Sequence, residues 1–201
     1  MRKWMLLLGV ALSYTASPGH AQVYTPTNLG DCIDIMAWNS QLLLGQLASH
    51  TKGRYYGSPS RLDPVSLSIY VEPYSCDADA PSYSGAPKTT GILAHELGHF
   101  AAGIPNVTPP LTKTEYVERL CVWEAQAASN NFKASSEIYQ ATAGYLDVPL
   151  IAQNASVIEP LIAGNSPLID IGNAFCDGNT NSSGKTYRKF YEDDYDARYP
   201  W

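Results

Sequence analysis

Apolar residues recur at helical spacing along much of this chain, and this pattern predicts mostly α-helices. In residues 28–49 apolar side chains return every three or four positions, which predicts a first helix. A second helix is expected over residues 90–103, where Leu93, Leu97 and Phe100 form an apolar stripe along one face. Both helices would pack against a core through these faces.

The longest expected helix follows a capping motif. Thr112 and Glu115 have the spacing of a capping box, in which the threonine caps the helix start and the glutamate reaches back to the cap amide. We expect this helix to run to about Tyr139 or beyond. The apolar segment 150–163 also favours a helix, with Pro160 as a kink or stop. Turn-forming residues dominate the chain after this segment.

One segment has the alternating pattern of a β-strand. Residues 66–72 alternate apolar and polar side chains, and Pro73 closes the segment, which is typical of a strand at the edge of a sheet. Residues 73–90 are rich in Pro, Gly, Ser and Asp and should form a loop. No internal repeat or linker divides the chain. The pattern therefore predicts an α+β fold that is helix-rich overall.

The first 21 residues have the layout of an export signal. Arg2 and Lys3 precede an apolar run over residues 4–12, which is well short of the about 20 residues that a membrane span needs. We therefore expect a cleaved signal peptide over residues 1–21 and a single domain over residues 22–201. The protein would be secreted or periplasmic, with no membrane span.

Charge and cysteine content fit an exported protein that does not bind nucleic acid. Removing Arg2 and Lys3 from the 13 basic residues leaves 11 against 19 acidic residues, a formal net charge of −8, which disfavours polyanionic partners. We expect a monomer. The exported part contains four cysteines without a C-x-x-C pair, which predicts two disulfides in one of three pairings. These cysteines are Cys32, Cys76, Cys121 and Cys176.

The strongest chemical signal is an H-E-x-x-H motif in the second expected helix. His95 and His99 are four residues apart, so both imidazoles project from one helix face, and Glu96 projects beside them. A chain of this composition would contain the motif by chance only about 0.003 times. Two neutral imidazoles suit Zn²⁺, which would leave places for a third protein ligand and a water. The alternative is a helix whose histidines are hydrogen-bonded or bind zinc only structurally.

The third ligand is expected on the long helix. The metzincin pattern fails, because Ala102 stands where glycine belongs and Pro105 where histidine belongs. Glu124 projects from an apolar helix face, and a buried carboxylate needs a partner, which a metal ion would supply. Glu124 is therefore the predicted third ligand. The alternative is a salt bridge within the core, for example to Arg119.

With His95-Glu-Leu-Gly-His99 followed by Glu124 in a Glu-Ala-Gln-Ala setting, residues 66–130 resemble the gluzincin group of zincin metallopeptidases. This resemblance implies a small mixed or antiparallel sheet packed on an active-site helix and on a long glutamate-bearing helix. It also implies that an edge strand aligns an extended protein or peptide substrate above the zinc.

This ligand set predicts hydrolysis of peptide bonds by a zinc-activated water with Glu96 as the general base. A further donor to the developing oxyanion is needed, and His50, Tyr139 and Tyr145 are candidates that the sequence does not rank. Two alternatives stay open. One is a non-catalytic, zinc-stabilised secreted binding module. The other is a cell-wall peptide hydrolase that uses the same site.

The segment from Tyr187 to Trp201 mixes aromatic and acidic side chains. It would cover the cleft, bind a partner, or form a solvated acidic surface whose aromatic residues anchor it to the domain. The last of these interpretations is favoured, because runs of charge are usually solvated.

Overall fold

The computed structural model describes residues 25–75, 85–109 and 111–200, and the predicted signal peptide lies outside them. The described residues form an α+β fold of seven helices and a three-stranded sheet. The elements in chain order are α1 (Asp31–Ala37), α2 (Gln41–Ser49), β1 (Arg54–Tyr56), β2 (Arg61–Leu62), β3 (Ile69–Val71), α3 (Ala86–Ala102), α4 (Lys113–Ala141), α5 (Ala155–Ala163), α6 (Leu168–Gly178) and α7 (Tyr187–Arg198). None of the described helices combines the length and apolarity that a membrane span requires.

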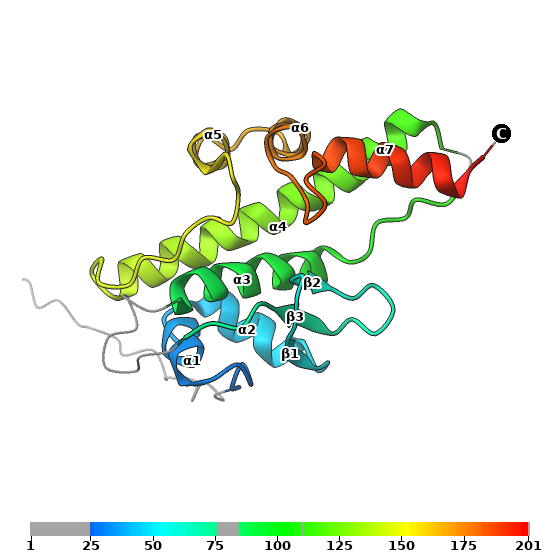
Figure 1. Cartoon of the computed structure of the whole chain (residues 1–201). Helices are drawn as coiled ribbons and strands as arrows, with labels where there is room; N and C mark the ends of the chain where they lie inside the picture. The colour runs from blue at the N-terminus through cyan, green and yellow to red at the C-terminus, as the bar shows by residue number, and fades with distance from the viewer. Residues whose placement is uncertain (1–24, 76–84, 110, 201) are drawn as a thin grey trace, which may run out of the picture.

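Helices α3 and α4 pack side by side through the middle of the molecule (Figure 1). The sheet, α1 and α2 lie on the side of α3, and α5, α6 and α7 lie on the side of α4. Because α3 carries the H-E-x-x-H motif and α4 carries Glu124, the central helix pair holds all of the predicted ligands.

The sheet is mixed, in the order β1-β3-β2. Strand β3 pairs in parallel with β1 and antiparallel with β2. The strand expected over residues 66–72 is therefore real but shorter, and it is the central strand, so its prediction as an edge was wrong. The edge next to α3 is β2, whose two residues were too few to stand out in the sequence.

The start of α4 confirms the capping box. The Thr112 hydroxyl accepts from the Glu115 amide, and the Glu115 carboxylate accepts from the Thr112 amide. Helix α3 begins four residues before the expected start at Thr90, because Pro87 lies in its first turn, where a missing amide proton costs nothing.

The helix expected over residues 28–49 is in fact two helices. Ser40 breaks it, because its backbone is extended and its side chain caps α2 by accepting from the Leu43 amide. Glu137 on α4 fixes this break by accepting from the Ser40 hydroxyl and the Leu42 amide. The start of α2 therefore depends on Glu137, which is 97 residues away from Ser40 in the sequence.

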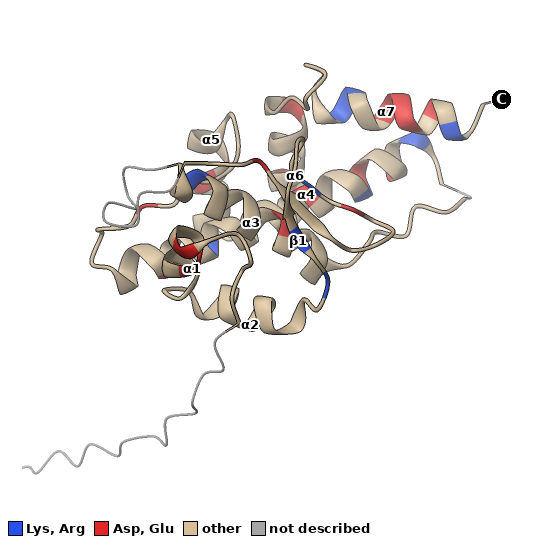
Figure 2. Ribbon diagram, turned by 60° about the horizontal axis from the view of Figure 1, so that its bottom comes forward, with Lys and Arg blue, Asp and Glu red and all other residues tan. Residues whose placement is uncertain are grey.

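The prediction that turns dominate after α5 was also wrong, since α6 and α7 both follow. Ile171 and Phe175 of α6 are buried, as are Tyr191 and Tyr195 of α7. The charged residues of α7 are basic toward its two ends and acidic in between (Figure 2), and Lys189 pairs with Asp193 and Arg198 with Asp194. Buried aromatic side chains thus anchor this segment to the domain.

Candidate metal centre

Helix α3 carries the three buried polar side chains of the H-E-x-x-H motif. The side chains of His95, Glu96 and His99 belong to residues that are 7%, 7% and 5% exposed. The two imidazoles come from positions four apart, one helical turn, so both project from the same face. Three polar residues this deeply buried need partners.

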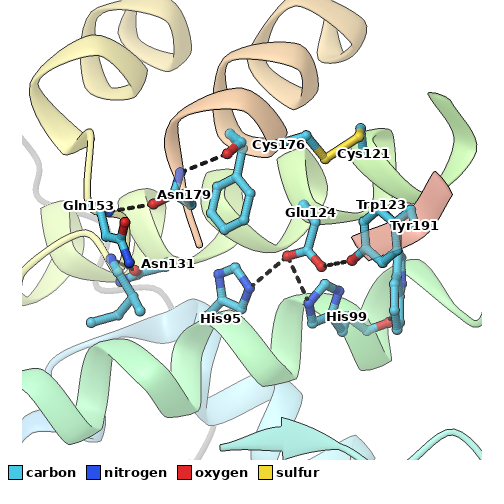
Figure 3. Close-up of polar contacts among 12 residues, drawn as sticks. His95, His99, Cys121, Trp123, Glu124, Asn131, Gln153, Cys176, Asn179 and Tyr191 are labelled. Carbon is cyan, nitrogen blue, oxygen red and sulfur yellow. Dashed lines mark hydrogen bonds and ion pairs between the residues drawn. A yellow bond between two sulfur atoms is a disulfide. The ribbon is translucent and has the colours of Figure 1, made fainter. Parts of the chain in front are cut away.

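Glu124 meets the two histidines from α4 and is 4% exposed (Figure 3). Its Oε2 atom lies 3.3 Å from the Nε2 atom of His95 and 3.4 Å from the Nε2 atom of His99. The candidate ligand atoms of the three residues all lie within 4.8 Å of one another. This buried group, which we call the metal group, could hold a metal ion.

The close approach of α3 to α4 depends on Gly98. A Cβ atom at this position would lie 2.7 Å from the Cα atom of Ala127, closer than such atoms come in proteins. Beside this contact, the Asn130 side chain donates to the Ala94 carbonyl and exchanges hydrogen bonds with Gln46 of α2. The glycine and the amide bridge together set the distance between the two histidines and Glu124.

The pKa values of the two carboxyl groups of the site are shifted in opposite directions. Burial disfavours the charged form of Glu124, but the imidazoles of His99 and His95 outweigh it and hold the pKa of this carboxyl well below its ordinary value. Burial raises the pKa of the Glu96 carboxyl to about 7, with the charge of Glu124 adding to the rise and His95 opposing it. Glu124 is therefore ionised like a ligand, whereas Glu96 can take up and release a proton near neutral pH.

Aromatic rings fix the orientation of both imidazoles. Phe175 of α6 stacks on His95 at a centroid distance of 5.8 Å, and Trp123 packs on His99 at 3.9 Å. The Nδ1 atoms of both histidines are buried, and no described atom is hydrogen-bonded to either. The rings are thus held by packing, with their Nε2 atoms turned toward Glu124.

Two tyrosines of α7 complete the site and were missed from the sequence. The Tyr191 hydroxyl donates to the Oε1 atom of Glu124 at 2.5 Å. Tyr187 packs its ring against Phe175, and burial raises the pKa of its phenol, as do the charges of Glu124 and Glu96. The sequence could have indicated them, because Tyr187 and Tyr191 are four residues apart in the aromatic terminal segment and so lie on one face of a helix.

A cavity of about 570 Å³ opens beside the metal group. His95, Glu96 and Tyr187 line one part of it, and Ile92 and Leu150 belong to its apolar wall. His99 and Glu124 are not among its lining residues. The base candidate and one histidine therefore face a space large enough for a ligand, whereas the rest of the metal group is covered.

Side-chain amides hold the opposite wall of the cavity in place (Figure 3). Asn131 accepts from the Ile151 amide and donates to the Pro149 carbonyl, while Asn179 accepts from the Gln153 amide. Residues 149–153 lack regular structure, and these bonds replace the backbone pairing of a helix or strand.

None of the three expected oxyanion donors lines this cavity. His50 is buried elsewhere, with its Nε2 atom 2.8 Å from the Leu67 carbonyl oxygen. Tyr139 and Tyr145 are 52% and 60% exposed. Arg119 does not pair with Glu124, because its guanidinium donates to the Asn106 carbonyl on the surface. The broader alternative of a salt bridge within the core stays open, since Glu124 contacts the two histidines.

A disulfide between Cys121 and Cys176 joins α4 to α6 close to the metal group. Cys121 lies one helical turn before Glu124, and Cys176 follows Phe175, so the bond ties a ligand helix to the wall of the cavity. Cys32 is disulfide-bonded too, and Cys76 lies outside the described residues. A disulfide agrees with the expected oxidising environment.

Comparison with known proteins gives no family for this chain: no family model, no curated protein and no solved structure matches it.

Proposed function

We propose that this chain is an exported zinc-dependent peptidase in which His95, His99 and Glu124 hold the metal and Glu96 is the general base. The observation that carries the proposal is the convergence of three buried ligand atoms beside a cavity that Glu96 also lines. A structural metal site needs no cavity, whereas a catalytic site must admit a substrate.

The spacing of the ligand atoms supports zinc. Ligands about 2.0–2.1 Å from a tetrahedral zinc ion are about 3.3–3.4 Å apart. The two contacts of the Glu124 Oε2 atom measure 3.3 and 3.4 Å. A charge-assisted hydrogen bond would instead be about 2.7–2.9 Å long. The donor set of two imidazoles and one carboxylate is also one that catalytic zinc sites use.

The edge strand β2 supports a peptide substrate. The Leu62 amide of β2 forms a hydrogen bond with the Glu96 carboxylate, so this edge of the sheet lies next to the proposed base. An extended peptide can pair with an exposed edge strand through its backbone. This arrangement fits the zincin-like geometry that the resemblance implies, with β2 in place of β3 as the edge.

The residues around the cavity can take different roles in the hydrolysis of a peptide bond. A zinc ion bound here would polarise the scissile carbonyl and acidify a water. Glu96, which lines the cavity beside His95, would take a proton from the attacking water and later give it to the leaving amine. Tyr187 lines the cavity, and its phenol can donate to the carbonyl oxygen as charge develops.

The test is to replace Glu96→Gln and to measure hydrolysis of a library of unstructured peptides together with zinc content. The variant should keep its zinc and lose at least about 100-fold in rate, as expected when a general base is removed. Glu118→Gln, an exposed change on α4, is the control and should keep the wild-type rate. An unchanged rate in Glu96→Gln would exclude the mechanism.

The same assay distinguishes the alternatives. A non-catalytic zinc-stabilised binding module would bind zinc without an exchangeable water and hydrolyse no member of the library. A cell-wall hydrolase would leave linear peptides intact and cleave peptide cross-links of peptidoglycan, again with a loss in Glu96→Gln.

A further inference from the structure

The two oxygens of Glu124 have separate partners. Oε2 faces the two histidines, and Oε1 accepts the hydrogen bond of Tyr191 (Figure 3). Rotation of the carboxylate plane about its terminal bond would take one oxygen away from the histidines and the other away from the Tyr191 hydroxyl. The hydrogen bond from Tyr191 opposes this rotation and so keeps one oxygen directed at the two histidines.

Tyr191 is well placed for this task because it is itself buried, with 7% of its surface exposed. Its ring packs against Tyr187 at a centroid distance of 5.9 Å.

The Tyr191 hydroxyl also has no substitute within the described part of the chain. The Nδ1 atoms of His95 and His99 have no hydrogen-bonded partner there. In most metal sites such atoms bind an outer group that orients the ring. Among the described residues, Tyr191 is the one outside the metal group that forms a hydrogen bond with a ligand side chain, and that ligand is Glu124.

The position of Tyr191 depends on the docking of α7 against the start of α4. The Tyr195 hydroxyl donates to the Leu111 carbonyl, Tyr116 donates to Asp194, and Lys113 pairs with Asp196. These contacts lie away from the metal group, so they set the place of α7 without contacting a ligand.

We propose that Tyr191 is a positioning residue that prepares Glu124 for the metal, so that metal binding and the docking of α7 are coupled. This inference rests on the metal site of the proposed function. If a docked α7 strengthens metal binding, the metal must strengthen the docking of α7 by the same factor.

The experiment compares Tyr191→Phe with Tyr195→Phe in the full chain. Both changes remove one buried phenol hydroxyl from α7, but only the first removes a contact with a ligand. Zinc affinity, measured by competition with a chromophoric chelator, should fall about 10- to 100-fold in Tyr191→Phe, as is typical when an outer partner of a ligand is lost. It should fall by a smaller factor in Tyr195→Phe, which weakens the docking of α7 but leaves the hydrogen bond from Tyr191 to Glu124 in place.

Amide hydrogen exchange gives a second readout that needs no enzymatic activity. Zinc should slow exchange in α7 of the wild type and of Tyr195→Phe, and should slow it less in Tyr191→Phe. If Tyr191→Phe does not fold, Tyr191→Met preserves the apolar bulk without the hydroxyl and takes its place.

The outcomes separate the two proposals. A wild type that binds zinc, with equal affinities in the two tyrosine variants, would overturn the role of Tyr191 and leave the metal site intact. A wild type without zinc affinity would overturn the metal site and this inference with it.

Discussion

Histidines are buried in two regions of the molecule, and their ring nitrogens are hydrogen-bonded differently in the two. In the region around Arg54, both ring nitrogens of His50 have partners: Nε2 lies 2.8 Å from the Leu67 carbonyl oxygen, and Nδ1 lies 3.1 Å from a guanidinium nitrogen of Arg54. In the metal group, one nitrogen of His95 and one of His99 have no described partner. The remaining contacts of these two histidines, both with Glu124, are long for hydrogen bonds.

This difference separates a structural role from a binding role. A folded chain pairs its buried polar groups wherever stability alone is at stake. His50 and Arg54 follow that rule, because Arg54 also donates to the carbonyls of Thr27, His50 and Pro26. The metal group departs from it, and such departures are expected where a site is arranged for a ligand.

The largest effect is expected from replacing one histidine of each region. His99→Gln should weaken zinc binding about 100-fold, because a total of about 10–16 kcal/mol shared by four ligands is about 3 kcal/mol for each. His50→Gln should leave zinc affinity unchanged. Chelator competition measures both affinities. Equal losses of zinc affinity in the two variants would show that the two regions do not differ in their role in zinc binding.

A thermal scan provides a check on the same variants. Zinc at about 100 times its dissociation constant should stabilise the wild type by about 2.7 kcal/mol. The melting temperature of His50→Gln should rise with zinc as in the wild type, whereas His99→Gln should show little shift at the same zinc concentration.

A smaller effect is expected from disturbing the distance between α3 and α4 without changing a ligand. Gly98→Ala places a Cβ atom against Ala127, and overpacking of this kind costs about 1–3 kcal/mol in the free energy of unfolding. Zinc affinity should fall as well, because Glu124 moves away from the histidines. Urea unfolding and chelator competition measure the two effects.

The control is Gly45→Ala in α2, where an added Cβ atom meets nothing within 4 Å. This change should stabilise the protein by roughly 0.5–1 kcal/mol, because alanine loses less entropy than glycine in a helix, and it should not alter zinc affinity. A Gly98→Ala protein as stable as Gly45→Ala would show that the helices do not need the close approach.

The smallest effect concerns pH and the region around Arg54. Burial lowers the pKa of His50 below its ordinary value of 6.5, and the charges of Arg54 and Lys52 add to the lowering. Below pH 6.5 the unfolded chain therefore binds more protons than the folded one. The stabilising contribution of neutral His50 is fully present above pH 6.5 and is lost as the pH falls toward the folded pKa.

Urea unfolding of metal-free protein at several pH values between 5 and 8 measures this contribution. The free energy of unfolding should fall less on acidification in His50→Gln than in the wild type, since the amide cannot be protonated. Parallel curves for the two proteins would mean that His50 does not titrate differently on folding.

Local spacing made part of the site predictable. His95 and His99 are four residues apart on one helix, and the cap at Thr112 set the start of α4, so both ligand helices could be predicted. Glu124 could be chosen because its helix neighbours are apolar. Its place beside the histidines depends on contacts between α3 and α4 that the sequence does not reveal, such as the one at Gly98.

Contacts between distant segments explain what was missed. The break at Ser40 depends on Glu137, and the two-residue strand β2 is defined only by its pairing with β3. Helix α6 follows a region rich in turn formers and is stabilised by burial of Phe175 against the metal group. The sequence suggested His50, Tyr139 and Tyr145 as donors because chain position alone does not show which side chains reach the cavity.

The hydrogen bond between Tyr191 and Glu124 joins residues 67 positions apart in the chain. During synthesis the ribosome releases α3 and most of α4 well before α7, so the two ligand helices can pair while Glu124 still lacks its phenol partner. The metal group would thus be completed in two stages, the pairing of α3 with α4 first and the docking of α7 second.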